Sequence, residues 1–205
     1  MRANCIFLTL FLAVFSGCAT TSVPSVRHAS PFPSIIALLP FENQSLDLRA
    51  PEVFRELMDT YLSASGFNIT DVKEAEEKLR GIGISEGGQL GAVTPQKLGE
   101  LLEADALLYG DIETFNNANI GVYASRTVKV ILRLVDAKTG EVLWETEKSK
   151  VNSKLGLSKE AAKDILVSGY ANKVAENIMD NPLYPESSDV ARLLVRELGK
   201  ARKSW

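Results

Sequence analysis

The stretch ADALLYGDIETF at residues 104–115 begins with a nearly continuous run of apolar side chains, which is typical of a strand covered on both faces of a sheet. A second run of this kind, SIIALLP, occupies residues 34–40. Residues 125–136 and 141–151 instead alternate between apolar and polar side chains, and turn residues lie between them, so they predict a hairpin. One face of this hairpin would carry Val128, Val130, Leu132 and Leu134. The sheet is therefore expected to be mixed, parallel in its early strands and antiparallel in its final hairpin.

Helical periodicity before and after these strands predicts the rest of the fold. The expected helices cover residues 51–65, 72–80, 95–102, 158–179 and 187–205, and a further short strand covers residues 67–70. Asp71 and Thr94 are the expected N-caps of two of these helices. The predicted fold class is α/β, a single-domain sandwich with a mixed five-stranded sheet and packed helices over residues 34–185, followed by a C-terminal amphipathic basic helix at residues 186–205.

The connection at residues 81–92 contains five glycines and predicts a mobile loop. A phosphate-binding P-loop would need Gly-Lys-Ser or Gly-Lys-Thr after the glycines, and no such sequence follows. We therefore expect a loop without a nucleotide site, which a partner could order.

The N-terminus predicts a signal peptide at residues 1–17 and a lipid attachment site at Cys18. Arg2 supplies a positive charge, and residues 5–15 (CIFLTLFLAVF) form an apolar run that is too short to span a bilayer as a helix. The segment FSGC, which ends at Cys18, resembles the bacterial lipobox. That resemblance implies cleavage between Gly17 and Cys18, and fatty acids such as palmitate on Cys18. The alanine that follows implies the periplasmic face of the outer membrane. The alternative is a secretory signal or membrane anchor with a coincidental cysteine.

Residues 18–33 (CATTSVPSVRHASPFP) are rich in Ser, Thr and Pro and predict a flexible lipid tether. His28 is the only histidine of the chain, and no Asp, Glu or Cys lies near it in the sequence. We interpret His28 as a solvated linker residue rather than a ligand.

The composition excludes several classes of protein. A chain of 205 residues with 45% hydrophobic and 24% charged residues is suited to a folded domain rather than a disordered one. The net charge of −3 predicts no binding to nucleic acid, and two cysteines exclude a disulfide-stapled scaffold. Asp111 and Glu113 share one face of a strand, but we interpret them as polar residues where the strand leaves the core. We predict no catalytic residue, no cofactor and no metal site.

Three segments resemble a known group of bacterial envelope proteins. The segments are residues 35–43 (IIALLPFEN), 104–112 (ADALLYGDI) and 134–144 (LVDAKTGEVLW). They resemble strands and a hairpin shared by the TolB N-terminal domain, the CsgG periplasmic domain and PelC, with Glu103 where the common motif has glycine. Two further segments, AP at residues 50–51 and TPQKL at residues 94–98, resemble more specifically a family of outer-membrane lipoproteins without an assigned function. The resemblance covers about residues 34–185 and implies a TolB-N-like or CsgG-like fold.

The chain departs from the pore-forming relatives in one respect. Pore formation needs extra segments that become membrane-spanning hairpins of about 9–11 alternating residues per strand, and the connections recognised here are short. The resemblance therefore implies an accessory subunit or a periplasmic ring rather than the pore.

The sequence thus predicts a non-enzymatic outer-membrane lipoprotein that serves as an accessory or structural subunit of an export or envelope-assembly complex. Its partners would be a CsgG-like or other envelope protein, or further copies of itself in a homo-oligomeric ring. We expect binding through sheet edges and loops, including residues 81–92 and 116–123. The alternative is a lipid-tethered periplasmic ligand-binding module, which would need a deep apolar pocket. Flat exposed apolar patches would favour the complex.

The last helix carries the clearest charge feature. Residues 187–205 have a net charge of +3 and an apolar stripe at helical spacing. Such a helix could dock on an anionic membrane or an acidic partner. We favour the other interpretation, a packed terminal helix with a solvated cationic face.

Overall fold

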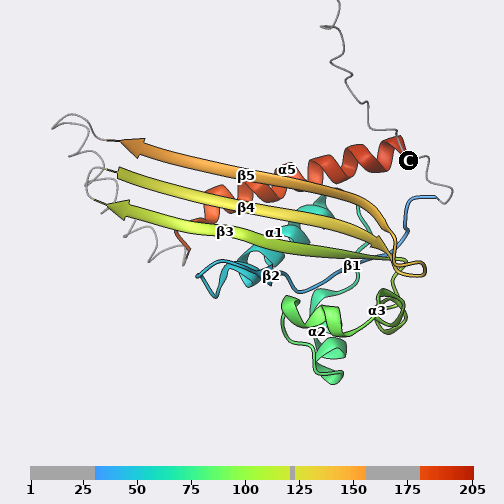
Figure 1. The fold of residues 1–205 in the computed structure, drawn as a ribbon. Coiled ribbons are helices and arrows are strands. Elements are labelled where there is room, and N and C mark those ends of the chain that lie inside the picture. Colours follow the sequence, from blue (N-terminus) through green and yellow to red (C-terminus); the bar gives the residue numbers. More distant parts are fainter. Residues whose placement is uncertain (1–30, 121–122, 156–180) are drawn as a thin grey trace, which may run out of the picture.

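A five-stranded mixed sheet forms the centre of the molecule (Figure 1). It is seen in a computed structural model that describes residues 31–120, 123–155 and 181–205. The strand order is β1-β3-β4-β5, and the short strand β2 pairs with β3 beyond the end of β1. Strands β1 (Ile36–Leu38) and β2 (Glu42–Asn43) run parallel to β3 (Ala106–Ile120). Strands β4 (Tyr123–Asp136) and β5 (Val142–Leu155) continue the sheet with antiparallel pairing. This confirms the predicted α/β fold with a mixed five-stranded sheet.

Several predicted features lie outside the described residues. They are the signal peptide at residues 1–17, Cys18, the tether up to residue 30 with His28, and the helix expected at residues 158–179.

The identity of the fifth strand differs from the prediction. Residues 67–70 do not form a strand and contribute a single parallel bridge, between Ile69 and Ile36. The fifth strand is β2, whose two residues pair with Asp111 and Ile112. Sequence periodicity cannot detect a two-residue strand, because its pairing depends only on where the neighbouring strand places its free backbone groups.

The three long strands β3, β4 and β5 extend further than the sequence predicts. Residues 116–120, expected to belong to a loop, continue β3 and pair with β4 as far as Ile120 opposite Tyr123. The Asn-rich sequence has low strand propensity, so only the ladder of backbone hydrogen bonds to β4 reveals this extension. Residues 116–120 and Tyr123 therefore form strands rather than a binding loop.

A β-bulge between Ile112 and Thr114 changes the side-chain phase of β3. Ile112 and Phe115 are three residues apart, so a regular strand would place them on opposite faces. With the extra residue Glu113, Phe115 returns to the face of Ile112, and both side chains are buried. The bulge therefore lets a chain with an irregular apolar pattern cover one continuous core.

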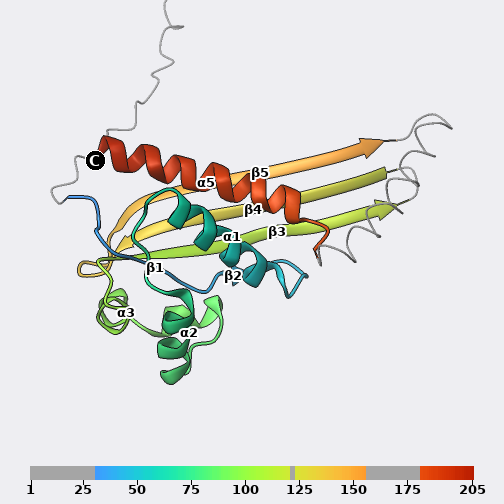
Figure 2. The same cartoon turned by 180° about the vertical axis from the view of Figure 1, so that it is seen from behind.

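Helices α1 (Ala50–Ala64) and α5 (Tyr184–Ser204) pack on one face of the sheet (Figure 2). Their buried side chains join those of the strands in one core cluster, which includes Phe54, Met58, Leu62, Val190, Leu194, Leu198, Val128, Val130, Leu132 and Leu134. Helix α5 begins at Tyr184 rather than at residue 187, because Pro185 occupies its first turn, where a missing N–H is tolerated. The division expected between residues 185 and 186 thus falls inside this helix.

The apolar stripe of α5 faces the core, as in the packed-helix interpretation. Its polar side forms ion pairs along the seam with β5, where Lys150 Nζ lies 3.2 Å from Asp189. The buried carboxylate of Glu186 lies 3.8 Å from Arg126 and accepts a hydrogen bond from Asn152 at 3.3 Å. None of the described helices is long and apolar enough to cross a membrane.

Helices α2 (Val72–Gly81) and α3 (Pro95–Leu102) and the 3-10 helix η1 (Gly87–Ala92) cover the opposite face of β1 and the start of β3. The predicted N-caps are confirmed, because Asp71 accepts from the backbone N–H groups of Lys73 and Glu74, and Thr94 accepts from that of Lys97. Residues 81–92, expected to be a mobile loop, are instead packed: Ile84 and Leu90 are buried. Tertiary burial of these two side chains orders a segment whose glycines suggest mobility.

The close approach of η1 to β2 explains the glycine at position 87. A Cβ atom at this position would lie 2.2 Å from the backbone N of Glu42 and 2.3 Å from the backbone C of Phe41. Only glycine lets η1 approach β2 this closely.

Arg55 connects the helices on the two faces of the sheet. From α1 its guanidinium reaches past the edge strand β1, donates a hydrogen bond to the Leu38 carbonyl at 3.1 Å and pairs with Glu76 on α2. The Arg55 side chain is 8% exposed and that of Glu76 is 36% exposed, so a buried charge pairs with a partly exposed one.

The first described residues pack against the C-terminus. The sequence predicts a flexible tether up to residue 33, but the Phe32 ring lies 5.2 Å from the ring of Trp205 and 6.2 Å from that of Phe67. Arg202 lies 4.1 Å above the Phe67 ring and donates hydrogen bonds to the Gly66 and Ser65 carbonyls at the end of α1. The chain therefore enters the domain at the same end where α5 terminates (Figure 1).

Candidate functional site

The β2–α1 loop, residues 44–49, presents two large apolar side chains to solvent. Leu46 is 100% exposed and Leu48 is 89% exposed, the two highest values among the exposed large apolar residues of the described chain. Single exposed leucines are common on protein surfaces, but two neighbouring ones held in a fixed conformation are a typical feature of a binding surface. The loop is therefore the candidate site.

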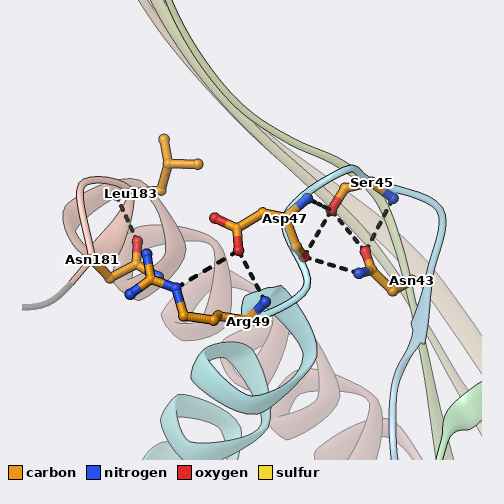
Figure 3. Close-up of polar contacts among 6 residues, drawn as sticks. All are labelled: Asn43, Ser45, Asp47, Arg49, Asn181 and Leu183. Carbon is orange, nitrogen blue, oxygen red and sulfur yellow. Dashed lines mark hydrogen bonds and ion pairs between the residues drawn. The ribbon is translucent and has the colours of Figure 1, made fainter.

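A network of polar side chains fixes the loop (Figure 3). The Asn43 amide donates to the Asp47 carbonyl at 2.9 Å, and Asn43 Oδ1 accepts from the backbone N–H and the hydroxyl of Ser45 at 3.0 and 2.7 Å. The Asp47 carboxylate accepts from the Arg49 backbone N–H at 2.9 Å. These local bonds replace the regular pairing that a loop lacks, so Leu46 and Leu48 stay exposed instead of folding back.

The loop is anchored to the sheet at its beginning. The backbone N–H of Gln44 donates to the Ile112 carbonyl at 3.0 Å, which continues the pairing of β2 with β3. The Gln44 side chain donates to both carboxylate oxygens of Asp111, at 3.1 and 2.9 Å. Asp111 therefore supports the start of the loop.

Asp111 and Glu113 have different polar partners. Glu113 contacts Lys129 Nζ at 2.6 Å, and Glu147 contacts the same nitrogen at 3.0 Å. Partial burial raises the pKa of Asp111 above its usual range, and the nearby charges of Glu42 and Glu113 raise it further. Each carboxylate thus has its own polar partner, which agrees with the interpretation of both as polar residues beside the core.

An open groove lies beside the loop, between α1 and the start of α5. Its volume is about 310 Å³, and it is lined by Arg49, Glu52, Val53, Glu56, Leu57, Thr60, Tyr61, Asn181 and Tyr184. At its inner side the Tyr61 hydroxyl lies 2.6 Å from the Ser188 hydroxyl, which links the two helices. Carboxylates and apolar side chains share its wall, so the groove can hold a side chain that combines a positive charge with an apolar stem.

Sequence reasoning missed Leu46 and Leu48. The segment QSLDLR places both leucines in a polar connection, between the first strand and the first helix, where they fit neither periodicity. That mismatch is a signal, but only the tertiary structure excludes their burial. Among the described residues, no group of three or more His, Cys, Asp or Glu side chains is placed to hold a metal ion.

Comparison with known proteins gives four similarities. A family model described as "Putative lipoprotein GNA1162-like" matches residues 25–201. The "Putative lipoprotein NMB1124/NMB1162" of Neisseria meningitidis serogroup B (strain ATCC BAA-335 / MC58) is 25% identical over 168 residues, which cover 80% of this chain and 78% of that protein.

The crystal structure of lipoprotein GNA1162 from Neisseria meningitidis is similar to this fold with a TM-score of 0.56 and 25% sequence identity, over 70% of this chain and 99% of that chain. A PelC dodecamer from Paraburkholderia phytofirmans gives a TM-score of 0.46 at 13% identity, over 79% of this chain and 86% of that chain.

Proposed function

We propose that this chain, which belongs to the GNA1162-like family of lipoproteins, is a lipid-anchored accessory or structural subunit of an export or envelope-assembly complex. Its role in this proposal is to bind other proteins rather than to catalyse a reaction. A CsgG-like protein is the partner class that the sequence motifs imply.

The observation that carries this proposal is the ordered exposure of Leu46 and Leu48. Their exposed fractions of 100% and 89% leave nearly all of both side chains available to a partner. Because the hydrogen bonds around Asn43 and Asp47 already order the loop, a partner would lose little binding free energy in fixing it. An ordered apolar protrusion supports a protein-binding role more than a ligand-binding one.

The groove beside α1 does not favour the ligand-binding alternative. A small-molecule site is usually an enclosed, mostly apolar cavity with few polar groups. This groove is open and carries the carboxylates of Glu52 and Glu56 among its lining residues. We therefore keep the complex subunit as the proposed function.

The proposal places the protein at the periplasmic face of the outer membrane, with lipid on Cys18. Replacing Cys18 by Ser is expected to move the protein from the membrane fraction to the soluble fraction, while Cys5→Ser, which lies within the expected signal peptide, leaves the fractionation unchanged. Unaltered membrane association of the Cys18→Ser chain would contradict the lipid anchor.

The complex itself is tested by its size. After membranes are solubilised in mild detergent, the native protein is expected to migrate in size-exclusion chromatography as an assembly of several chains. Chemical crosslinking in intact cells is expected to preserve the same assembly. Recovery of the monomer alone under both conditions would contradict the proposed function.

A further inference from the structure

The surface around Leu46 and Leu48 is acidic. Glu42, Glu52 and Glu56 are exposed, and the Asp47 carboxylate lies within the loop itself. The nearby Arg49 is 3.9 Å from Asp47, and Arg55 is buried and paired with Glu76 on the far side of β1. The two leucines therefore project from a region whose net charge is negative.

This charge pattern argues against a membrane as the partner. An anionic bilayer surface attracts Lys and Arg and repels carboxylates. Leucines that insert into such a surface are normally surrounded by cationic side chains, and here the surrounding side chains are mainly anionic.

A second copy of this chain is also a poor match. Cationic side chains of the described chain lie on α5 and on the edge strand β5, and several are paired within the chain: Lys150 and Arg192 with Asp189, and Lys200 with Glu197. Within α5, only Tyr184 at the helix start belongs to the exposed large apolar side chains. The acidic surface around the leucines of one copy would thus meet cations that are already paired within the second copy.

We infer that residues 44–49 and the carboxylates of Glu52 and Glu56 form a single docking surface for a different protein, one that presents an apolar cleft bordered by Lys or Arg side chains. Leu46 and Leu48 enter the cleft, and the cationic border lies over the acidic groove beside α1, where apolar stems of Lys or Arg contact Val53 and Leu57. Opposite charges around a buried apolar centre select this partner over like-charged competitors. This inference rests on the proposed function and specifies the chemistry of the partner.

The test uses the full chain in intact cells, with a photo-crosslinking amino acid at position 46 or 48. A matched control carries the same amino acid at position 82, because Ile82 is also exposed, at 47%, but lies at the end of α2. We expect a discrete heteromeric adduct from positions 46 and 48 that is at least about tenfold stronger than from position 82. The double charge reversal Glu52→Lys and Glu56→Lys is expected to weaken the adduct about tenfold or more. Mass spectrometry of the crosslinked peptide should identify a segment with Lys or Arg beside apolar residues.

Four results would overturn the inference: an adduct of two copies of this chain, an adduct within one chain, an adduct to lipid alone, or a heteromeric adduct insensitive to the charge reversal. A second measurement separates this inference from the proposed function. In the Leu46→Ser, Leu48→Ser chain the large assembly should dissociate at least about tenfold more readily, with an unchanged unfolding curve because both side chains are exposed. If the assembly forms and persists in this variant, the docking surface is refuted and the complex is not. If no assembly forms in the native protein, both are refuted.

Discussion

Replacing Gly87 by Ala should destabilise the packing of η1 against β2, the strand from which the β2–α1 loop with Leu46 and Leu48 begins. An added Cβ would lie 2.2 Å from the Glu42 backbone N, 2.3 Å from the Phe41 backbone C and 2.5 Å from the Phe41 carbonyl oxygen. All three contacts are to backbone atoms, so no side-chain rotation can relieve them. The backbones of η1 and β2 would have to separate by about 1 Å to restore van der Waals distances.

Overpacking of a core costs about 1–3 kcal/mol, and we expect about 3 kcal/mol here because the neighbour is backbone. For a domain of this size the free energy loss corresponds to a fall in Tm of about 6–12 °C. The assay is urea unfolding of the purified protein in one detergent, followed by circular dichroism, with thermal unfolding in parallel.

Gly88→Ala and Gly91→Ala are matched controls in the same short segment. A Cβ at either position meets no atom within 4 Å, so we expect each to change the free energy of unfolding by less than about 1 kcal/mol. If Gly87→Ala proved as stable as these controls, the close approach of η1 to β2 would be refuted, together with the argument that it supports the loop.

Three further predictions concern charged residues. Arg55→Met should lower the free energy of unfolding by about 2–3 kcal/mol, because it removes the donor to the buried Leu38 carbonyl and leaves Glu76 with the exposed Arg80 as its partner. Arg80→Met, which removes only the exposed partner of the same carboxylate, should cost at most about 0.5 kcal/mol. Equal losses in urea unfolding would contradict this. Arg202→Gln should cost about 1–2 kcal/mol through loss of two hydrogen bonds and the contact with an aromatic ring, and a normal melting curve would refute this role. A hydrogen bond from a lysine on β5 holds the pKa of Asp189 below its usual range, so its contribution to stability is present at neutral pH and lost as the pH falls through that pKa. The pKa of Asp111 is raised, so ionisation of this carboxyl lowers the stability of the fold instead. At pH 7 Asp189→Asn should therefore destabilise the fold and Asp111→Asn should stabilise it. Both differences should vanish in acid when unfolding is followed across pH.

Much of the fold follows from local sequence alone. The alternation over Val128 and Leu132 predicts a strand whose one face is buried, and Asp71 and Thr94 predict helix starts, because these effects act within a few residues of the chain. The family resemblance is likewise contained in strand cores and turn residues. For example, Asp136 accepts from two backbone N–H groups of the predicted turn.

Other features depend on contacts between distant segments. Residues 116–120 become strand because β4 supplies hydrogen-bond partners, and residues 81–92 become ordered because Ile84 and Leu90 find a core to enter. The bulge at Glu113 appears only when β3 must pair with β4 and still bury Phe115. No local pattern contains this information, since each outcome depends on which surface lies opposite.

The candidate site shows the same division. The sequence by itself determined an α/β domain of a lipoprotein family and predicts a lipid tether at Cys18, because strand periodicities, helix caps and a signal segment are properties of neighbouring residues. Only the tertiary structure decided that Leu46 and Leu48 remain in solvent while dozens of other apolar side chains are buried. The physical reason is that burial needs a complementary surface, and hydrogen bonds from Asn43 and Ser45 hold these two side chains away from the one that the domain provides.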